Sequence, residues 1–209
     1  AFVRIARALT AAGDPSRLDG ALDVVATKPA GDVRLTSDYT LTGERVDLAN
    51  LRLAAPGAAL GGEVGLGLAT LAVDGGLEGG SDDLAALGRW LDVPLAGALD
   101  LELALAAAET QTARLDAAAR GLDAAGVALD RLDLNATAAA LFATPRLDVR
   151  ATVAGLASGG TTVERAEATV AGDLERLDVT LDAAGALPQP FELAGEGDVR
   201  LAGGTTAVT

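Results

Sequence analysis

The chain has 209 residues, half of them hydrophobic, and its 30 acidic against 16 basic side chains give a formal net charge of −14. This acidity argues against a nucleic-acid binder, which needs a basic face. The chain holds no histidine and no cysteine, which excludes the usual serine and cysteine triads, disulfides and thiolate metal sites. Aromatic residues make up only 2%, so the apolar mass is leucine, valine and alanine.

Residues 1–17 form a lead-in segment that fits two predictions. We favour a short helix over residues 1–13 with Gly13 as its C-cap, and the alternative is a strand that continues from upstream. The chain starts at Ala1 and contains no methionine, so we expect a segment of a longer protein. No run of about 18 apolar residues is present, so any membrane anchor is expected outside residues 1–209.

From Leu18 onward the hydrophobic period is two, which predicts half-buried strands. Turn signals rich in proline and glycine separate the strands, and alternation is cleanest between Leu95 and Leu105. An apolar-x-x-apolar step interrupts the period at several places. A three-residue step turns side chains to the other face unless a β-bulge, a bend or a tight reversal resets the facing. We expect such resets at Leu48/Leu51, Leu68/Leu71, Leu129/Leu132, Val163/Ala166 and Leu174/Leu177.

Residues 81–91 break the strand pattern. Apolar residues recur there at a helical spacing: Leu84, Leu87, Trp90 and Leu91. Ser81 is the expected N-cap, the two aspartates after it complement the helix dipole, and Pro94 follows the end. This pattern predicts a short amphipathic helix that either plugs one end of the sheet or covers a groove as a lid.

Residues 121–185 contain an internal repeat. Gly121–Asn135 aligns with Gly155–Thr169, and each copy precedes an Arg-Leu-Asp-Val unit, at residues 146–149 and 176–179. Repeats of this length are typical of extended arrays.

Motifs for catalysis, cofactors or metals are absent. The carboxylate pairs occupy alternating polar positions, which indicates a solvated face, and no Asp-x-Asp-x-Asp loop or phosphate-binding glycine motif is present. The Asn135-Ala-Thr137 sequon lies in a strand pattern and carries little weight. We assign no catalytic, metal-binding or cofactor-binding residue and no cofactor.

What remains is an aliphatic stripe, which is the candidate site. It is either the closed core of a sandwich or barrel, or the inner wall of a trough that binds apolar ligand. Burial of one methylene is worth about 0.8 kcal/mol, so one acyl chain gains several kcal/mol on such a wall. Alternation alone leaves both readings open. The stripe comprises Val33, Leu35, Leu48, Leu53, Leu66, Leu68, Leu99, Leu101, Leu103, Leu129, Leu134, Leu147, Val149, Leu177, Val179 and Leu181.

Five runs give the chain a likeness to a known family. They are Leu51–Leu60, Asp83–Gly97, Pro145–Val149, Gly155–Gly160 and Pro190–Gly195. In texture and spacing, from about Leu18 onward, the chain resembles the TamB family of translocation and assembly module proteins of Gram-negative bacteria.

The resemblance implies an all-β fold: a long curved, mostly antiparallel sheet bent into an open groove (a β-taco, open jelly-roll-like) with one short helix near 81–91. It also implies one segment, 1–209, of an inner-membrane-anchored protein that crosses the periplasm toward the outer membrane. The groove of this family is linked to phospholipid acyl chains and outer-membrane biogenesis. The expected protein partner, reached through other parts of the chain, is an outer-membrane barrel of the TamA/BamA type. No catalytic residues carry over, and groove residues carry over only as a class, by their parity along each strand.

Two alternatives belong to other classes. A scaffold would pair its sheet edges with client β-strands during insertion of outer-membrane barrels or autotransporters. A secreted β-solenoid adhesin would show asparagine or threonine ladders, and none is evident. An enzyme is the least favoured class.

Overall fold

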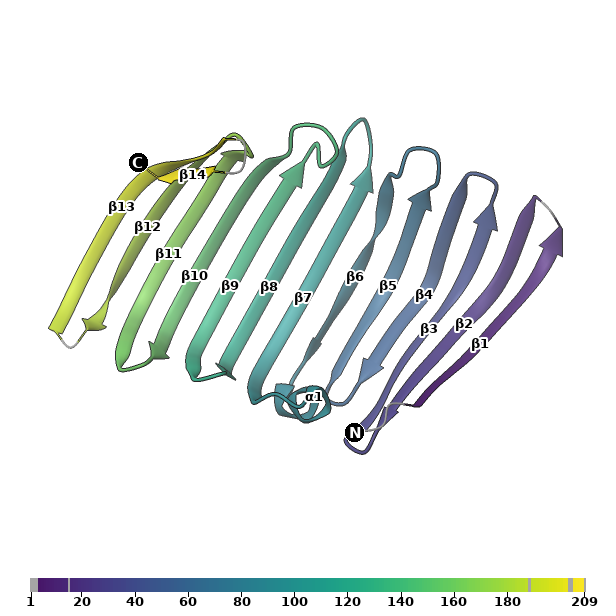
Figure 1. The fold of residues 1–209 in the computed structure, drawn as a ribbon, viewed down its shortest axis with the longest axis horizontal. Coiled ribbons are helices and arrows are strands. Elements are labelled where there is room, and N and C mark those ends of the chain that lie inside the picture. Colours follow the sequence, from purple (N-terminus) through teal and green to yellow (C-terminus); the bar gives the residue numbers. More distant parts are fainter. Residues whose placement is uncertain (1–3, 15, 188, 203–204, 209) are drawn as a thin grey trace. The chain divides into compact units, whose positions relative to one another are not determined.

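In a computed structural model, the structure describes residues 4–14, 16–187, 189–202 and 205–208. Contacts within the chain divide it into two units, residues 1–107 and 108–209, and we describe each by itself. In both units each strand pairs antiparallel with the strands next to it in sequence (Figure 1). The all-β class, the antiparallel pairing and the single short helix are therefore confirmed. The sheet of each unit is open and uncurled, and its bending into a groove stays a prediction.

The described residues of the first unit form seven strands and the helix. They are β1 (Arg4–Asp14), β2 (Arg17–Lys28), β3 (Gly31–Thr42), β4 (Arg45–Ala55), β5 (Ala58–Gly67), β6 (Val73–Ser81), α1 (Leu84–Leu91) and β7 (Leu95–Ala107). In the part of the second unit that the structure describes there are seven strands. They are β8 (Gln111–Ala124), β9 (Val127–Ala139), β10 (Arg146–Ser158), β11 (Thr161–Asp173), β12 (Arg176–Leu187), β13 (Gln189–Ala202) and β14 (Thr205–Val208).

The lead-in segment is a strand, so the favoured helix over residues 1–13 is wrong and the alternative is found. β1 pairs with β2 in one unbroken register, from Arg4 opposite Thr27 to Asp14 opposite Arg17. Pairing along this whole length outweighs the weak local preference of an alanine-rich segment for helix. Residues 1–3 and 15 lie outside the described residues.

Helix α1 forms where the spacing predicts it, but it begins later. Ser81 ends β6, and the N-cap is Asp83, whose Oδ1 accepts a hydrogen bond from the backbone N–H of Ala85 at 3.0 Å. Asp83 is the N-cap because its carboxylate accepts a hydrogen bond from one of the free N–H groups of the first turn. Among the described residues no helix has the length and apolarity to cross a membrane.

The expected phase resets coincide with irregularities in the ladders. The β4 register shifts against β5 between Leu48 and Leu51, and the β11 register shifts against β12 between Val163 and Arg165. The steps at Leu68/Leu71 and Leu174/Leu177 lie at reversals between strands. The step at Leu129/Leu132 spans Asp130, which the ladders to β8 and to β10 both skip.

Each unit is a single layer with very little core. Of the described hydrophobic residues, four are buried: Leu84, Ala119, Leu129 and Ala184. A sheet that is hydrophobic on one face normally buries it against a second layer. Among the described residues of each unit no second sheet covers the strands, so their apolar side chains depend on neighbours in the same layer.

Candidate functional site

One face of the first unit is aliphatic across six strands. Residues directly opposite each other in an antiparallel ladder present their side chains on the same face, so the registers trace rows across the sheet. One such row runs Val24, Leu35, Leu53, Leu60, Gly79 and Leu101. A second row runs Gly20, Tyr39, Leu48, Val64, Gly75 and Leu105. We call this surface from β2 to β7 the apolar face of the first unit.

The structure brings eight of the nine predicted stripe residues of this unit onto the apolar face. They are Val33, Leu35, Leu48, Leu53, Leu66, Leu99, Leu101 and Leu103, and all are half-buried. Leu68 does not belong to it, because it follows β5 in the reversal and is 42% exposed. Sequence reasoning left out Leu51, Leu60, Val64 and Leu77 of the same face, which alternation alone could have added.

The second unit repeats the arrangement. One row runs Leu134, Ala151, Ala168, Leu181 and Gly195, and a neighbouring row runs Ala136, Val149, Val170, Val179 and Gly197. Leu147 and Leu177 both lie opposite Gly172, on the same side of the sheet. Leu129 lies beyond the interruption at Asp130 and is buried, with 9% of its surface exposed. These residues form the apolar face of the second unit.

A bulge keeps the leucines of β4 on one side. Asn50 has a positive φ of 52°, and Ser37 of β3 faces the two residues Asn50 and Leu51. The buried Ser37 hydroxyl lies 3.0 Å from the carbonyl oxygen of Ala49, and Asn50 Nδ2 donates to Asp38 Oδ2 at 2.8 Å. The extra residue lets Leu48 and Leu51 face the same way across a three-residue step. Sequence reasoning did not predict that Ser37 and Asp38 bond the bulge.

The opposite face carries the charge. Every charged side chain of β3 to β7 lies there, and arginine–aspartate pairs run along or between strands. Arg17 Nε donates to Asp19 Oδ2 at 2.8 Å, and Arg45 bonds both Asp47 and Asp74. The Arg17 guanidinium and then the Thr40 hydroxyl lower the pKa of Asp19 by hydrogen bonding to its carboxylate. Such exposed pairs add little stability, but they keep this face solvated.

Helix α1 lies against one end of the apolar face and leaves a pocket beneath it. The pocket has a volume of about 190 Å³. Its large lining side chains are Leu53, Leu60, Leu84, Leu87, Leu99 and Leu101. The expectation that the helix lies at one end of the sheet agrees with this position, and the lid alternative stays a prediction.

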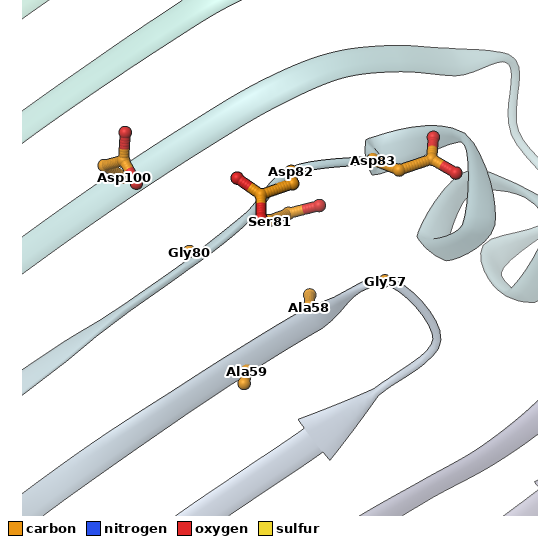
Figure 2. A pocket seen from close by; sticks show the side chains of 8 residues that line it. All are labelled: Gly57, Ala58, Ala59, Gly80, Ser81, Asp82, Asp83 and Asp100. Carbon is orange, nitrogen blue, oxygen red and sulfur yellow. The ribbon is translucent and has the colours of Figure 1, made fainter.

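A second pocket, of about 530 Å³, lies near the start of α1 (Figure 2). Figure 2 shows Asp82 and Asp100 on separate segments, whereas the carboxylate of Asp83 is turned toward the helix that it caps. Among the described residues, no group of three or more histidine, cysteine or acidic side chains is placed to hold a metal ion. We assign no chemistry to this pocket.

No family model, curated protein or solved structure matches the chain. The fold and the site define a class by themselves: open antiparallel sheets with one aliphatic and one charged face. The six strands of the first unit's face are separated by five spacings of about 4.8 Å and are about 30 Å long, so the face covers roughly 700 Å². Soluble monomers rarely expose so large an apolar patch unless it binds something.

Proposed function

We propose that the chain is a segment of a periplasmic bridge whose apolar faces carry phospholipid acyl chains between the inner and outer membranes. The observation that carries this proposal is the apolar face of the first unit. Its rows run from β2 to β7 without a charged side chain between β3 and β7. This proposal builds on the resemblance to the TamB family. It includes two further properties of that family: support of outer-membrane biogenesis, and an inner-membrane anchor that lies outside this segment.

The chemistry of the face favours a fluid chain over a folded protein as its occupant. Protein interfaces are enriched in aromatic residues and arginine, which give anchors and direction. The apolar face of the first unit offers leucine, valine and alanine, and its described side chains include a single aromatic one, that of Tyr39. An acyl chain gains from burial alone and needs no directional partner. The charged opposite face would stay in water.

A second candidate is the scaffold that pairs a sheet edge with client strands. One observation supports it: β1 pairs with β2 in an unbroken register and contains no proline and no bulge, which are two of the features that blunt an edge. In this alternative the chain would assist insertion of barrel or autotransporter proteins together with a TamA/BamA-type barrel.

Native mass spectrometry with lipid extraction tests the two candidates. The chain would be purified from cells alongside a Leu101→Asp, Leu103→Asp variant, which places two carboxylates on the apolar face. The matched control is Ala98→Asp, Ala104→Asp, which adds the same charge to the opposite face of the same strand. Circular dichroism would establish that all three chains keep their strands.

Phospholipid that copurifies with the wild-type chain and the control, but not with the leucine variant, supports acyl-chain carriage. A wild-type chain that is free of lipid and unfolds in one cooperative step means that the leucines close a core. In that case the scaffold becomes the better proposal.

A further inference from the structure

Helix α1 is fastened to the β2–β3 turn by two side chains. Lys28 Nζ donates to the backbone oxygen of Trp90 at 2.7 Å and to Asp92 Oδ2 at 3.0 Å, and it lies 4.8 Å from the centroid of the indole ring. Trp90 Nε1 donates to the backbone oxygen of Gly31 at 3.0 Å. These contacts fix the C-terminal end of the helix across about 60 residues of sequence. They hold α1 in place without filling the space under its first turns.

That space is the 190 Å³ pocket, here called the α1 pocket. Two leucines of α1, Leu84 and Leu87, form one side, and leucines of β4, β5 and β7 form the other. An engineered protein cavity of about 150 Å³ lined by leucine, isoleucine and phenylalanine stays dry and binds benzene. The α1 pocket thus has the size for a short piece of hydrocarbon and is too small for a whole lipid.

The lining excludes a headgroup. The described residues that line the pocket include no charged side chain, and their single polar side chain is that of Ser81, whose hydroxyl is buried and has no hydrogen-bond partner. A phosphate or ammonium group would lose its hydration there and gain no opposite charge in return.

The pocket continues a row of the apolar face. Leu53 and Leu101 belong both to the pocket lining and to the row that starts at Val24 and Leu35. A hydrocarbon chain that lies along this row therefore reaches the pocket without crossing a polar group. Beyond it lies α1, where Arg89 and the C-cap residue Asp92 are exposed.

We propose that the α1 pocket receives the methyl end of an acyl chain lying on the apolar face, so that α1 acts as an end-stop for the chain. This inference rests on the proposed function, because it names which part of the lipid reaches one part of the same face. It sets the direction of the bound lipid: the tail points toward α1 and the headgroup away from it.

Trp90 gives a direct readout, because it is the single tryptophan of the chain. It follows Leu87 by three residues, a rise of about 4.5 Å along a helix. The probe is phosphatidylcholine with a nitroxide on one acyl chain. The nitroxide lies either near the methyl end of that chain or near the end that is next to the headgroup. The full 209-residue chain would be loaded from vesicles of each lipid and separated from them, and electron paramagnetic resonance would count the bound label. We expect the methyl-end nitroxide to quench Trp90 fluorescence more than the headgroup-end nitroxide does.

Two variants and one control test the pocket itself. Ala58→Leu fills the pocket from β5, and Leu87→Asp places a carboxylate in it should the first variant fail to fold. Ala104→Leu adds the same bulk to the charged face of β7, away from the pocket lining and from the apolar face. Either pocket variant should abolish the difference between the two labels, and the control should keep it.

Bound lipid with equal quenching by both labels, or a difference that survives both pocket variants, overturns the end-stop and leaves acyl-chain carriage standing. A wild-type chain that takes up no labelled lipid overturns the proposed function and the end-stop together.

Discussion

Gly121 and Gly155 occupy the same place in consecutive hairpins and both adopt a left-handed backbone, with φ of 56° and 64°. Each lies near the end of its strand, four residues before a two-residue turn with two positive φ angles: Ala125-Gly126 and Gly159-Gly160. The internal repeat is therefore a repeat of backbone conformation. Gly121 and Gly155 mark where the ladders from β8 to β9 and from β10 to β11 skip a pair.

Replacing these two glycines by alanine should have unequal effects. Both variants force an L-residue into the left-handed region, which costs about 1 kcal/mol. At Gly121 an added Cβ meets nothing within 4 Å, whereas at Gly155 it would run into the side chain of Asp130, whose Cβ lies 2.8 Å away. We expect Gly155→Ala to lower the free energy of unfolding by roughly 1 kcal/mol more than Gly121→Ala. Urea titration followed by circular dichroism measures both, and equal losses would show that Asp130 moves aside freely.

The turn between β8 and β9 offers a stabilising change. Ala125 has a φ of 52° in a position where the second hairpin has Gly159, with a φ of 58°. Asparagine tolerates this conformation far better than alanine, and Asn-Gly is the preferred pair for such a turn. Ala125→Asn should raise the free energy of unfolding by about 0.5–1 kcal/mol. Ala124→Asn, at the end of β8, is the control and should not raise the free energy of unfolding in the same urea titration. An equal increase in this control would show that the stabilisation does not come from the turn conformation.

From Leu18 onward the alternating pattern predicted most strands and the face of most stripe residues, with Leu68 as an exception. With a period of two, Leu99, Leu101 and Leu103 must share a side, and the three-residue step at Leu48/Leu51 required a reset that the structure supplies as a bulge. These features are local, because the facing of a side chain follows from its neighbours in sequence.

Features that depend on distant residues were not predictable in this way. β1 is a strand because β2 pairs with all of it, and the position of α1 depends on Lys28 and Gly31, about 60 residues earlier. The α1 pocket has the same origin, since residues of β4, β5, β6 and β7 must meet the helix to form it. Hydrophobic periodicity contains no information on which turn a helix contacts.

Lys28 should hold α1 in place. Its side chain is only 16% exposed, and its ammonium group combines two hydrogen bonds with the face of the Trp90 ring. Lys28→Met keeps the aliphatic stem and removes the charge, and it should weaken the attachment of the helix by roughly 1–2 kcal/mol. Acrylamide quenching of Trp90 fluorescence should then increase, and hydrogen exchange of residues 84–91 should accelerate while that of β9 and β10 stays unchanged. Unchanged exchange over α1 would show that its leucines alone hold the helix.

The arginine–aspartate pairs should make stability depend on acid pH. The Arg34 guanidinium bonds the Asp23 carboxylate, with Nε 3.0 Å from Oδ1, and thereby lowers the pKa of Asp23 in the folded chain. Hydrogen bonds from Arg114 and then Asn135 lower the pKa of Asp116 in the same way. A carboxyl with a lowered folded pKa binds fewer protons than it does in the unfolded chain. Its contribution is therefore complete above the ordinary aspartate pKa and is lost as the pH falls through the folded value.

The midpoint of thermal unfolding, followed by circular dichroism from neutral pH into this acid range, measures the effect. We expect the midpoint to fall as the pairs are protonated, and Asp23→Asn to make that fall shallower. Arg34→Met should have the same effect, and the double variant should add nothing further, because both substitutions remove one interaction. Additive effects of the two substitutions would mean that each side chain acts through separate partners and that the pair does not carry the pH dependence.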